Sequence, residues 1–358
     1  MSGTRGPIRT PGLTWRWSDA LRGAVTAAPA SVAALSDVQL GAGLAIGLLP
    51  VCPLPLPPSR VARVKLALYG VLAAVSILVG GVLAQWPAVA VTAMLLAGGA
   101  MGHLVAHLRR PIAMLGLLLC LPLLAVGFSY PGPETTAGLA VDILLGTAWA
   151  VLVAVCWPGG RTPAAPPVAE ARRTPATMVP YGWIAGLVGA VCAAIGFAAD
   201  LEHVGWAPAA ALLVMRPNPP TQRMRSLDRL ADVVLGAVAA SLLVAIDPPG
   251  WVYAGAIGLV VVAATATSGS RWYVLPTFTT FFVFVLLLAR DPADAPHRFW
   301  ERSLETGLGV AVAALGAFLV LPAVLRRRRR DAAEPPPGTS TRPPSPRGGS
   351  AADPRRAD

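Results

Sequence analysis

Two stretches of this 358-residue sequence place charged residues at the start of long apolar runs. They share one spacing, in which a carboxylate follows an arginine by three residues and a glycine follows it by seven: Arg302, Glu305 and Gly309, and Arg229, Asp232 and Gly236. Positions i, i+3 and i+7 lie on one face of an α-helix. A guanidinium can bind the carboxylate of an organic anion through two parallel hydrogen bonds. A carboxyl group one turn deeper in the apolar run can carry a proton.

Two further residues extend this pattern. Thr306 places a hydroxyl group beside Glu305, and Asp142 with Gly146 repeats the inner pair in another apolar run, where Leu139 replaces the arginine. The candidates are therefore substrate contacts and proton carriers: Arg302, Arg229 and Thr306 in the first group, and Glu305, Asp232 and Asp142 in the second. A structural alternative stays open, because Arg302 and Glu305 could neutralise each other as an i,i+3 pair that anchors a helix end.

The composition indicates that these charges lie in a membrane. The chain is 55% hydrophobic and 13% charged, whereas about a quarter of the residues of a soluble domain are charged. Its apolar runs are about 17 to 25 residues long, which is the length that crosses about 30 Å of hydrocarbon as an α-helix. We therefore predict an all-α integral membrane protein.

The apolar runs predict about twelve transmembrane helices. The expected spans are 19–36, 38–54, 66–84, 86–106, 111–128 and 137–157 in the first half, and 180–199, 204–215, 230–246, 251–267, 273–289 and 303–325 in the second. The spans 19–36, 38–54 and 204–215 are short or contain proline, so they need not cross the membrane completely.

An internal repeat divides the chain into two halves. Residues 55–70 parallel 217–236, and residues 24–37 loosely parallel 187–200, at an offset near 164 residues. This offset predicts two tandem six-helix repeats, a plan known from transporters. The expected segments are an N-terminal segment 1–18, a first repeat 19–157, a linker 158–179, a second repeat 180–325, and a polybasic, disordered tail 326–358.

The basic residues predict the orientation of the chain. The formal net charge is +11, and nearly all basic residues fall in the loops on one side of the expected spans. The loop 290–302 is the exception, since it places Arg290, Arg298 and Arg302 on the other side. Both termini are therefore expected in the cytoplasm of a bacterium, with the protein in its plasma membrane. The spread of charge over short loops argues against a nucleic-acid partner, and the run Arg326–Arg330 could bind anionic lipid.

The remaining motifs do not indicate an enzyme, a metal site or a cofactor. The cysteines lie in or beside apolar runs without C-x-x-C spacing. His103 and His107 have i,i+4 spacing, but no acidic or thiol ligand lies near them in sequence. The sequence contains no phosphate-binding loop, nucleophile elbow or metalloprotease motif. We therefore expect a protein that is not an enzyme, binds no cofactor and has lipids and a small organic anion as partners.

Three stretches resemble the fusaric acid resistance protein-like family: "HVGWAPAAALLVMRP" (203–217), "RLADVVLG" (229–236) and "RSLETGLGVAVAAL" (302–315). The family pattern R-x-x-[DEG]-T-x-x-G is met in full by Arg302, Glu305, Thr306 and Gly309, and in part at Arg229. The resemblance covers 180–325 and, through the repeat, loosely 19–157. The family includes bacterial aromatic acid exporters, and the plant aluminium-activated malate transporters are similar to it in their membrane module. Many relatives carry a large soluble domain where this chain has about twenty linker residues.

The resemblance implies a secondary-active exporter of aromatic or amphipathic organic anions that works by proton exchange. Two other functions stay open. An anion channel would use the arginines to line a pore and would carry steady current without proton coupling. A membrane scaffold would carry no flux and would depend on residues 331–358 more than on any intramembrane charge. A homo-oligomer is compatible with each of these functions.

Overall fold

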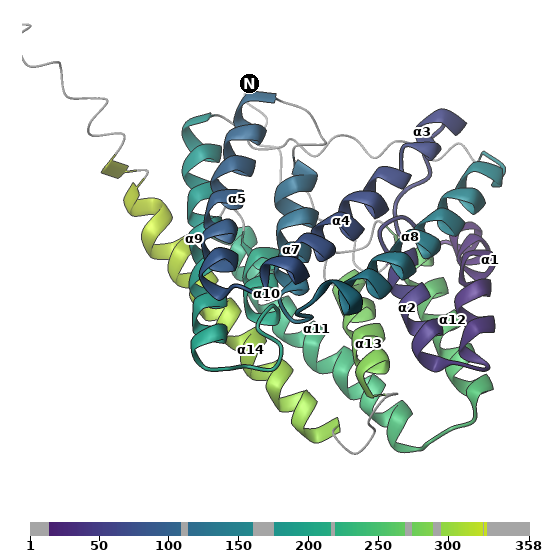
Figure 1. Cartoon of the computed structure of the whole chain (residues 1–358). Coiled ribbons are helices and arrows are strands. Elements are labelled where there is room, and N and C mark those ends of the chain that lie inside the picture. The colour runs from purple at the N-terminus through teal and green to yellow at the C-terminus, as the bar shows by residue number, and fades with distance from the viewer. Residues whose placement is uncertain are drawn as a thin grey trace, which may run out of the picture.

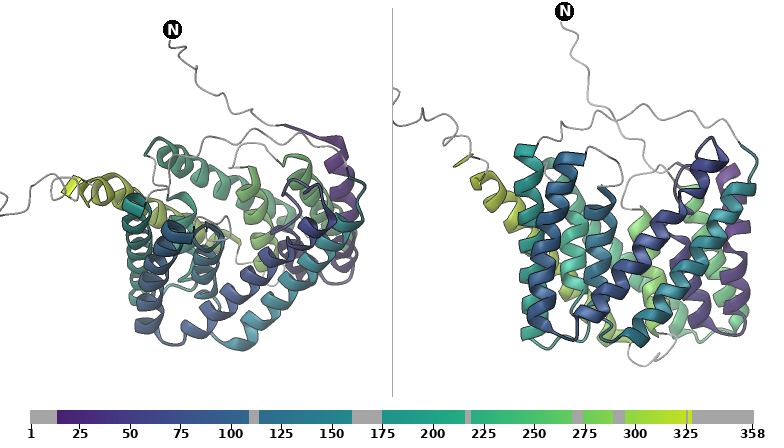
Figure 2. Two further views of the ribbon diagram at one scale, coloured as in Figure 1. Left: turned by 90° about the horizontal axis from the view of Figure 1, so that it is seen from above. Right: turned by 45° about the horizontal axis from the view of Figure 1, so that its top comes forward.

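The apolar runs of the sequence fold as helices because a helix satisfies its own backbone hydrogen bonds in an apolar environment. The structure is a computed structural model that describes residues 14–108, 114–159, 175–215, 219–268, 274–288, 295–324 and 326–327. Within these ranges every regular element is a helix, and the long helices run side by side between two faces of a bundle (Figures 1 and 2). The predicted all-α class is therefore confirmed.

The helices follow the order of the predicted spans. The first half contains α1 (Trp17–Ala34), α2 (Val38–Leu48), α3 (Arg60–Val64), α4 (Ala67–Leu83), α5 (Pro87–Leu108), the π-helical turn η1 (Gly116–Cys120), α7 (Leu121–Gly127) and α8 (Pro133–Cys156). The second half contains α9 (Pro175–Ala198), α10 (Trp206–Val214), α11 (Pro219–Ala245), α12 (Gly250–Ala266), α13 (Val274–Leu288), α14 (Ala295–Leu315) and the π-helical turn η3 (Gly316–Val320).

Five of the described helices are long and apolar enough to cross a membrane. They are Arg60–Leu83, Pro87–Leu108, Pro133–Cys156, Pro175–Ala198 and His297–Val324. The spans predicted at 38–54 and 204–215 are shorter than expected, because α2 ends at Leu48 and α10 has nine residues. Pro50 lies two residues after Leu48, and a proline has no backbone N–H with which to continue the helix. Nine helical residues rise about 14 Å, less than half of a bilayer core.

The two larger hydrophobic cores of the described bundle each contain residues from both halves of the chain, and a smaller third core lies between α4 and α8. One of the two larger cores lies among α5, α7, α9, α10 and α14, and the other lies among α1, α2, α11, α12 and α13. The closest helix pairs also join the halves, since α5 packs along α9 and α1 packs along α12. The two halves are therefore interleaved.

Glycine allows the close approach of α5 and α9. A Cβ atom at Gly102 would lie 2.7 Å from the Gly182 Cα and 2.9 Å from the Met178 carbonyl oxygen. Backbone atoms cannot move aside as a flexible side chain would. We therefore expect Gly102→Ala to lower the free energy of unfolding by about 1–3 kcal/mol, measured as a lower thermal midpoint in detergent.

Gly138 of α8 provides the matched control for this prediction. Nothing lies within 4 Å of a Cβ atom at this position. Gly138→Ala should therefore gain the helix propensity of alanine, about 0.5–1 kcal/mol, without a clash. Equal effects of the two substitutions on the thermal midpoint would show that the α5–α9 approach does not limit stability.

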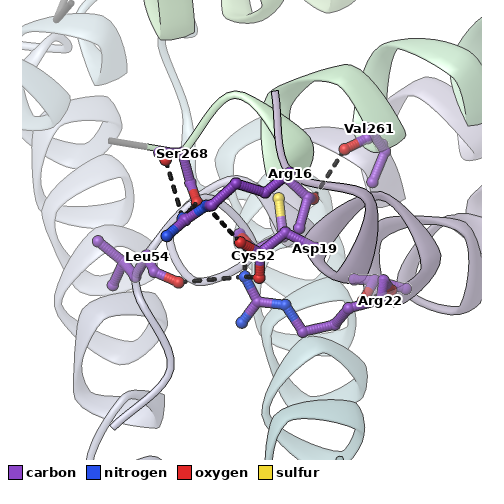
Figure 3. Close-up of polar contacts among 9 residues, drawn as sticks. Arg16, Asp19, Arg22, Cys52, Leu54, Val261 and Ser268 are labelled. Carbon is purple, nitrogen blue, oxygen red and sulfur yellow. Dashed lines mark hydrogen bonds and ion pairs between the residues drawn. The ribbon is translucent and has the colours of Figure 1, made fainter. Parts of the chain in front are cut away.

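Two arginines, the partly buried Arg16 and the buried Arg22, join helix ends on the face where α1 begins (Figure 3). The Arg16 Nη2 donates to the Ser268 carbonyl oxygen at 2.9 Å, and its Nε pairs with Asp19 Oδ2 at 2.7 Å. The Arg22 Nη2 donates to the carbonyl oxygens of Cys52 at 3.2 Å and Leu54 at 3.3 Å. These bonds tie the start of α1 to the end of α12 and to the chain after α2, so Arg16 has a structural role.

Arg63 has a similar role at the end of α8. Its Nη1 donates to the carbonyl oxygens of Ala154 at 2.9 Å and Trp157 at 2.7 Å, and its Nε donates to the Pro57 carbonyl oxygen at 2.8 Å. Carbonyl groups at a helix C-terminus attract cations. Arg63 therefore caps a helix end, although the repeat aligns it with the candidate substrate contact Arg229.

Candidate functional site

The candidate site lies where α11 and α14 pack together with α10 and α13. Five of the six predicted site residues meet there and are almost completely buried: Arg229, Asp232, Arg302, Glu305 and Thr306. Arg302 and Glu305 lie seven and ten residues after the first residue of α14, or about 10 Å and 15 Å along the helix. The charges are therefore well inside the bundle.

Two glycines bring the charged helix faces together. A Cβ atom at Gly309 would overlap the Ala207 carbonyl oxygen of α10, and a Cβ atom at Gly236 would lie 2.7 Å from the Thr277 carbonyl oxygen of α13. Because these glycines follow their arginines by seven residues, the face that packs closely is also the face that carries the charges. The spacing noted in the sequence thus places both arginine–carboxylate pairs toward neighbouring helices.

The charged groups of the site do not pair with one another. Thr277 donates from its Oγ1 to Asp232 Oδ1 at 2.9 Å. Within the described residues, several other buried atoms have no hydrogen-bond partner: Arg302 Nε and Nη1, Arg229 Nε, both carboxylate oxygens of Glu305, Asp232 Oδ2, and the hydroxyls of Thr280 and Thr306. Arg302 and Glu305 thus form no ion pair at contact distance in the described part of the chain, although their opposite charges still attract each other. Their burial without partners is costly.

Aromatic contacts hold the Arg302 guanidinium instead. Its Cζ lies 4.3 Å from the centroid of the indole ring of Trp206, the first residue of α10. The His203 ring stacks on the same indole, with centroids 3.9 Å apart and 16° between the planes. Sequence reasoning did not select Trp206 or His203, although both lie in the stretch 203–217. The signal was weak, since an aromatic residue in an apolar run usually serves packing alone.

An ion-pair network lies at the outer end of this site. His203 Nδ1 lies 3.0 Å from Glu301 Oε1, and Arg298 Nη1 lies 2.5 Å from Glu202 Oε2 and 3.5 Å from Glu301 Oε2. Glu202, His297 and Glu301 place three ligand atoms within 4.8 Å of one another. The guanidinium of Arg298 already compensates both carboxylates, so we assign no metal to this group. Arg298, one of the exceptions to the topology pattern, is thus neutralised locally.

Asp142 lies apart from the other candidates. It is half-buried on α8, which packs against α2 near Gly43 and Gly47. In the described part of the chain it has no hydrogen bond or ion pair. The nearby Thr147 donates to the Gly47 carbonyl oxygen at 3.0 Å, which joins α8 to α2. Asp142 therefore lies at the contact between α8 and α2 and does not contribute to the site between α11 and α14.

An all-helical bundle with several membrane-length helices and a buried polar cluster is the architecture of a multi-pass membrane protein of the transporter type. Residues 190–316 match the family described as fusaric acid resistance protein-like, which confirms the resemblance over most of the second half. This range contains Trp206 and the five clustered candidates. The comparisons found no match among curated proteins and none among solved structures.

Proposed function

We propose that this protein is a secondary-active transporter that exports aromatic or amphipathic organic anions in exchange for protons. The observation that carries the proposal is the set of buried guanidinium, carboxyl and hydroxyl atoms between α11 and α14 that have no hydrogen-bond partner among the described residues. Arg302, Arg229 and Thr306 are the proposed substrate contacts. Glu305 and Asp232 are the proposed proton carriers at the same site, and Asp142 is the proposed carrier in the first half.

The charges of the site favour alternating occupancy by an anion and by protons. Arg229 and Arg302 are close enough for their positive charges to repel each other, and a substrate carboxylate would relieve this repulsion. The free guanidinium N–H groups suit bidentate binding of a carboxylate. When the substrate leaves, ionised Glu305 and Asp232 can balance the arginines, and proton uptake by these carboxylates makes the site positive again. The arginine charges are balanced by the substrate anion in one state and by the ionised carboxylates in the other. Release of the anion is therefore coupled to loss or uptake of protons by the carboxylates.

We further propose that the helices form two tandem six-helix repeats, 19–157 and 180–325. A matching set of helix contacts supports this plan. The pair α2 and α8 corresponds to α10 and α14, and the pair α4 and α7 corresponds to α11 and α13. Between the halves, α5 with α9 corresponds to α12 with α1. Tandem repeats with a site at mid-depth are a common transporter plan.

The proposed location is the plasma membrane of a bacterium, with both termini in the cytoplasm. The distribution of arginine over the loops supports this orientation. The local neutralisation of Arg298 by Glu202 and Glu301 weakens the exception in 290–302. Arg326–Arg330 would then face the anionic inner leaflet. The absence of recognised catalytic motifs in the sequence supports transport rather than an enzymatic activity.

The test is solid-supported-membrane electrophysiology on purified protein in liposomes, with a panel of aromatic and aliphatic carboxylates and with or without a pH gradient. Transient, substrate-dependent currents that respond to the gradient are expected. Sustained current that does not depend on the gradient would contradict exchange and favour an anion channel. Silence across the panel from protein with a cooperative thermal transition would contradict transport of these anions and favour a scaffold, which deletion of 331–358 should then impair.

A further inference from the structure

The described part of the chain places the Trp206 indole against the Arg302 guanidinium. The indole is 1% exposed, and the guanidinium carbon lies 4.3 Å from its ring centroid. The Arg302 Nε and Nη1 have no hydrogen-bond partner among the described residues. An arginine side chain has several rotatable bonds and would otherwise adopt several orientations. A flat guanidinium on an aromatic face keeps its N–H edges free for an anion.

The indole of Trp206 is in turn held by residues of the ion-pair network, His203 and Glu301. His203 stacks on it, and His203 Nδ1 lies 3.0 Å from Glu301 Oε1 on α14. The backbone N–H of Gly205, directly before Trp206, donates to Ser129 Oγ at 3.0 Å. The Tyr130 ring meets the His203 ring edge-on, with centroids 6.4 Å apart. These contacts attach the turn before α10 to the end of α7 and to the start of α14, so the indole has little freedom to move.

We propose that Trp206 is a positioning residue of the anion site, which holds the Arg302 guanidinium so that its free N–H edge meets a substrate carboxylate. His203 supports this arrangement by holding the indole. The inference rests on the proposed function, in which Arg302 contacts the substrate. The inference assigns a role to Trp206, which lies outside the motif formed by Arg302, Glu305 and Gly309.

This role differs from direct recognition of an aromatic substrate. The guanidinium and the imidazole already contact the indole, so the structure leaves Trp206 as a support and not as a platform for the substrate ring. A weaker support should therefore lower the affinity for aromatic and aliphatic carboxylates by the same factor. Direct stacking on the substrate would instead lower only the affinity for the aromatic ones.

The test replaces Trp206 with mono-, di- and trifluorinated tryptophan by site-specific incorporation, because each fluorine weakens the cation–π attraction with little change in shape. Trp183 of α9, which is 40% exposed, is the matched control position. The thermal midpoint without substrate and the half-saturating concentrations of benzoate and hexanoate are measured. We expect the midpoint to fall stepwise at Trp206 only. The half-saturating concentration should rise for both anions by a common factor, roughly 2- to 30-fold over the series, with maximal current retained.

Three results would overturn the proposal: a flat thermal midpoint at Trp206, a midpoint that falls without any change in half-saturation, or a change for benzoate alone. The same series in an Arg302→Gln background identifies the partner, since the dependence of the midpoint on fluorination must disappear there. Wild-type protein that shows no saturable current for any anion would instead overturn the proposed function. In that case the thermal midpoints of the fluorinated variants still show whether Trp206 holds Arg302, because these midpoints are measured without substrate.

Discussion

Replacing Glu305 with glutamine is expected to reduce gradient-driven flux of organic anions to background while the protein remains folded. Glutamine keeps the shape of the side chain but cannot release or bind a proton in the working range. Both oxygens of Glu305 lack hydrogen-bond partners among the described residues, and the side chain is 3% exposed. No ion pair is therefore broken, and the free energy of unfolding should change by less than about 1 kcal/mol. Flux is measured in liposomes and folding by thermal melting.

Glu134 supplies the matched control for this substitution. It lies in the first turn of α8 and is exposed, away from the cluster between α11 and α14. Glu134→Gln should leave the gradient response at the wild-type level. If Glu305→Gln protein retains full gradient-driven flux, Glu305 is not the essential proton carrier. Asp232→Asn and Asp142→Asn then decide between the two other carriers.

Replacing Arg302 with glutamine is expected to raise the half-saturating concentration of carboxylate substrates by roughly 30-fold or more. This factor corresponds to the loss of about 2 kcal/mol or more, which is typical when one member of a buried, charge-assisted contact is removed. Arg302→Lys keeps the charge but loses the planar donor pair. It should therefore fall between wild type and Arg302→Gln. The measurement is the concentration dependence of the transient current.

The control for Arg302 is Arg60, an exposed residue at the start of α3. Arg60→Gln removes the same charge from the chain but should leave half-saturation unchanged. Two outcomes contradict the assigned role of Arg302. One is unaltered half-saturation in Arg302→Gln, and the other is a steady current in Arg302→Ala that no longer distinguishes among anions, as a channel would give.

Local features of the site follow from the sequence because helix periodicity is local. The i, i+3 and i+7 spacing correctly places Arg302, Glu305 and Gly309 on one buried face, and the same holds for the motif at Arg229. The separation of Arg302 from Glu305 does not follow from spacing, because residues that share a face can still point to different partners. The role of Trp206 depends on how α10 packs against α14, and the sequence pattern carries no information on that contact.

The arrangement of the helices was less predictable than their existence. The repeat predicted two halves but not that the two larger hydrophobic cores would each combine helices from both. Contacts such as those between α1 and α12 join segments far apart in the chain, and a single sequence does not reveal such pairs. Arg63 shows the same limit, since its alignment with Arg229 suggested a common role while its actual partners are the carbonyl groups at the end of α8.

The interleaving of the two halves has a consequence for biogenesis. When α1 and α5 enter the membrane, the helices that cover them, α12 and α9, have not yet been synthesised. The glycine-bearing surface of the first half therefore stays exposed to lipid until the helices of the second half have been synthesised and inserted. A gene divided within 158–179 would therefore yield two fragments, neither of which reaches its native packing alone. Simultaneous production of both in one membrane would restore the complete bundle.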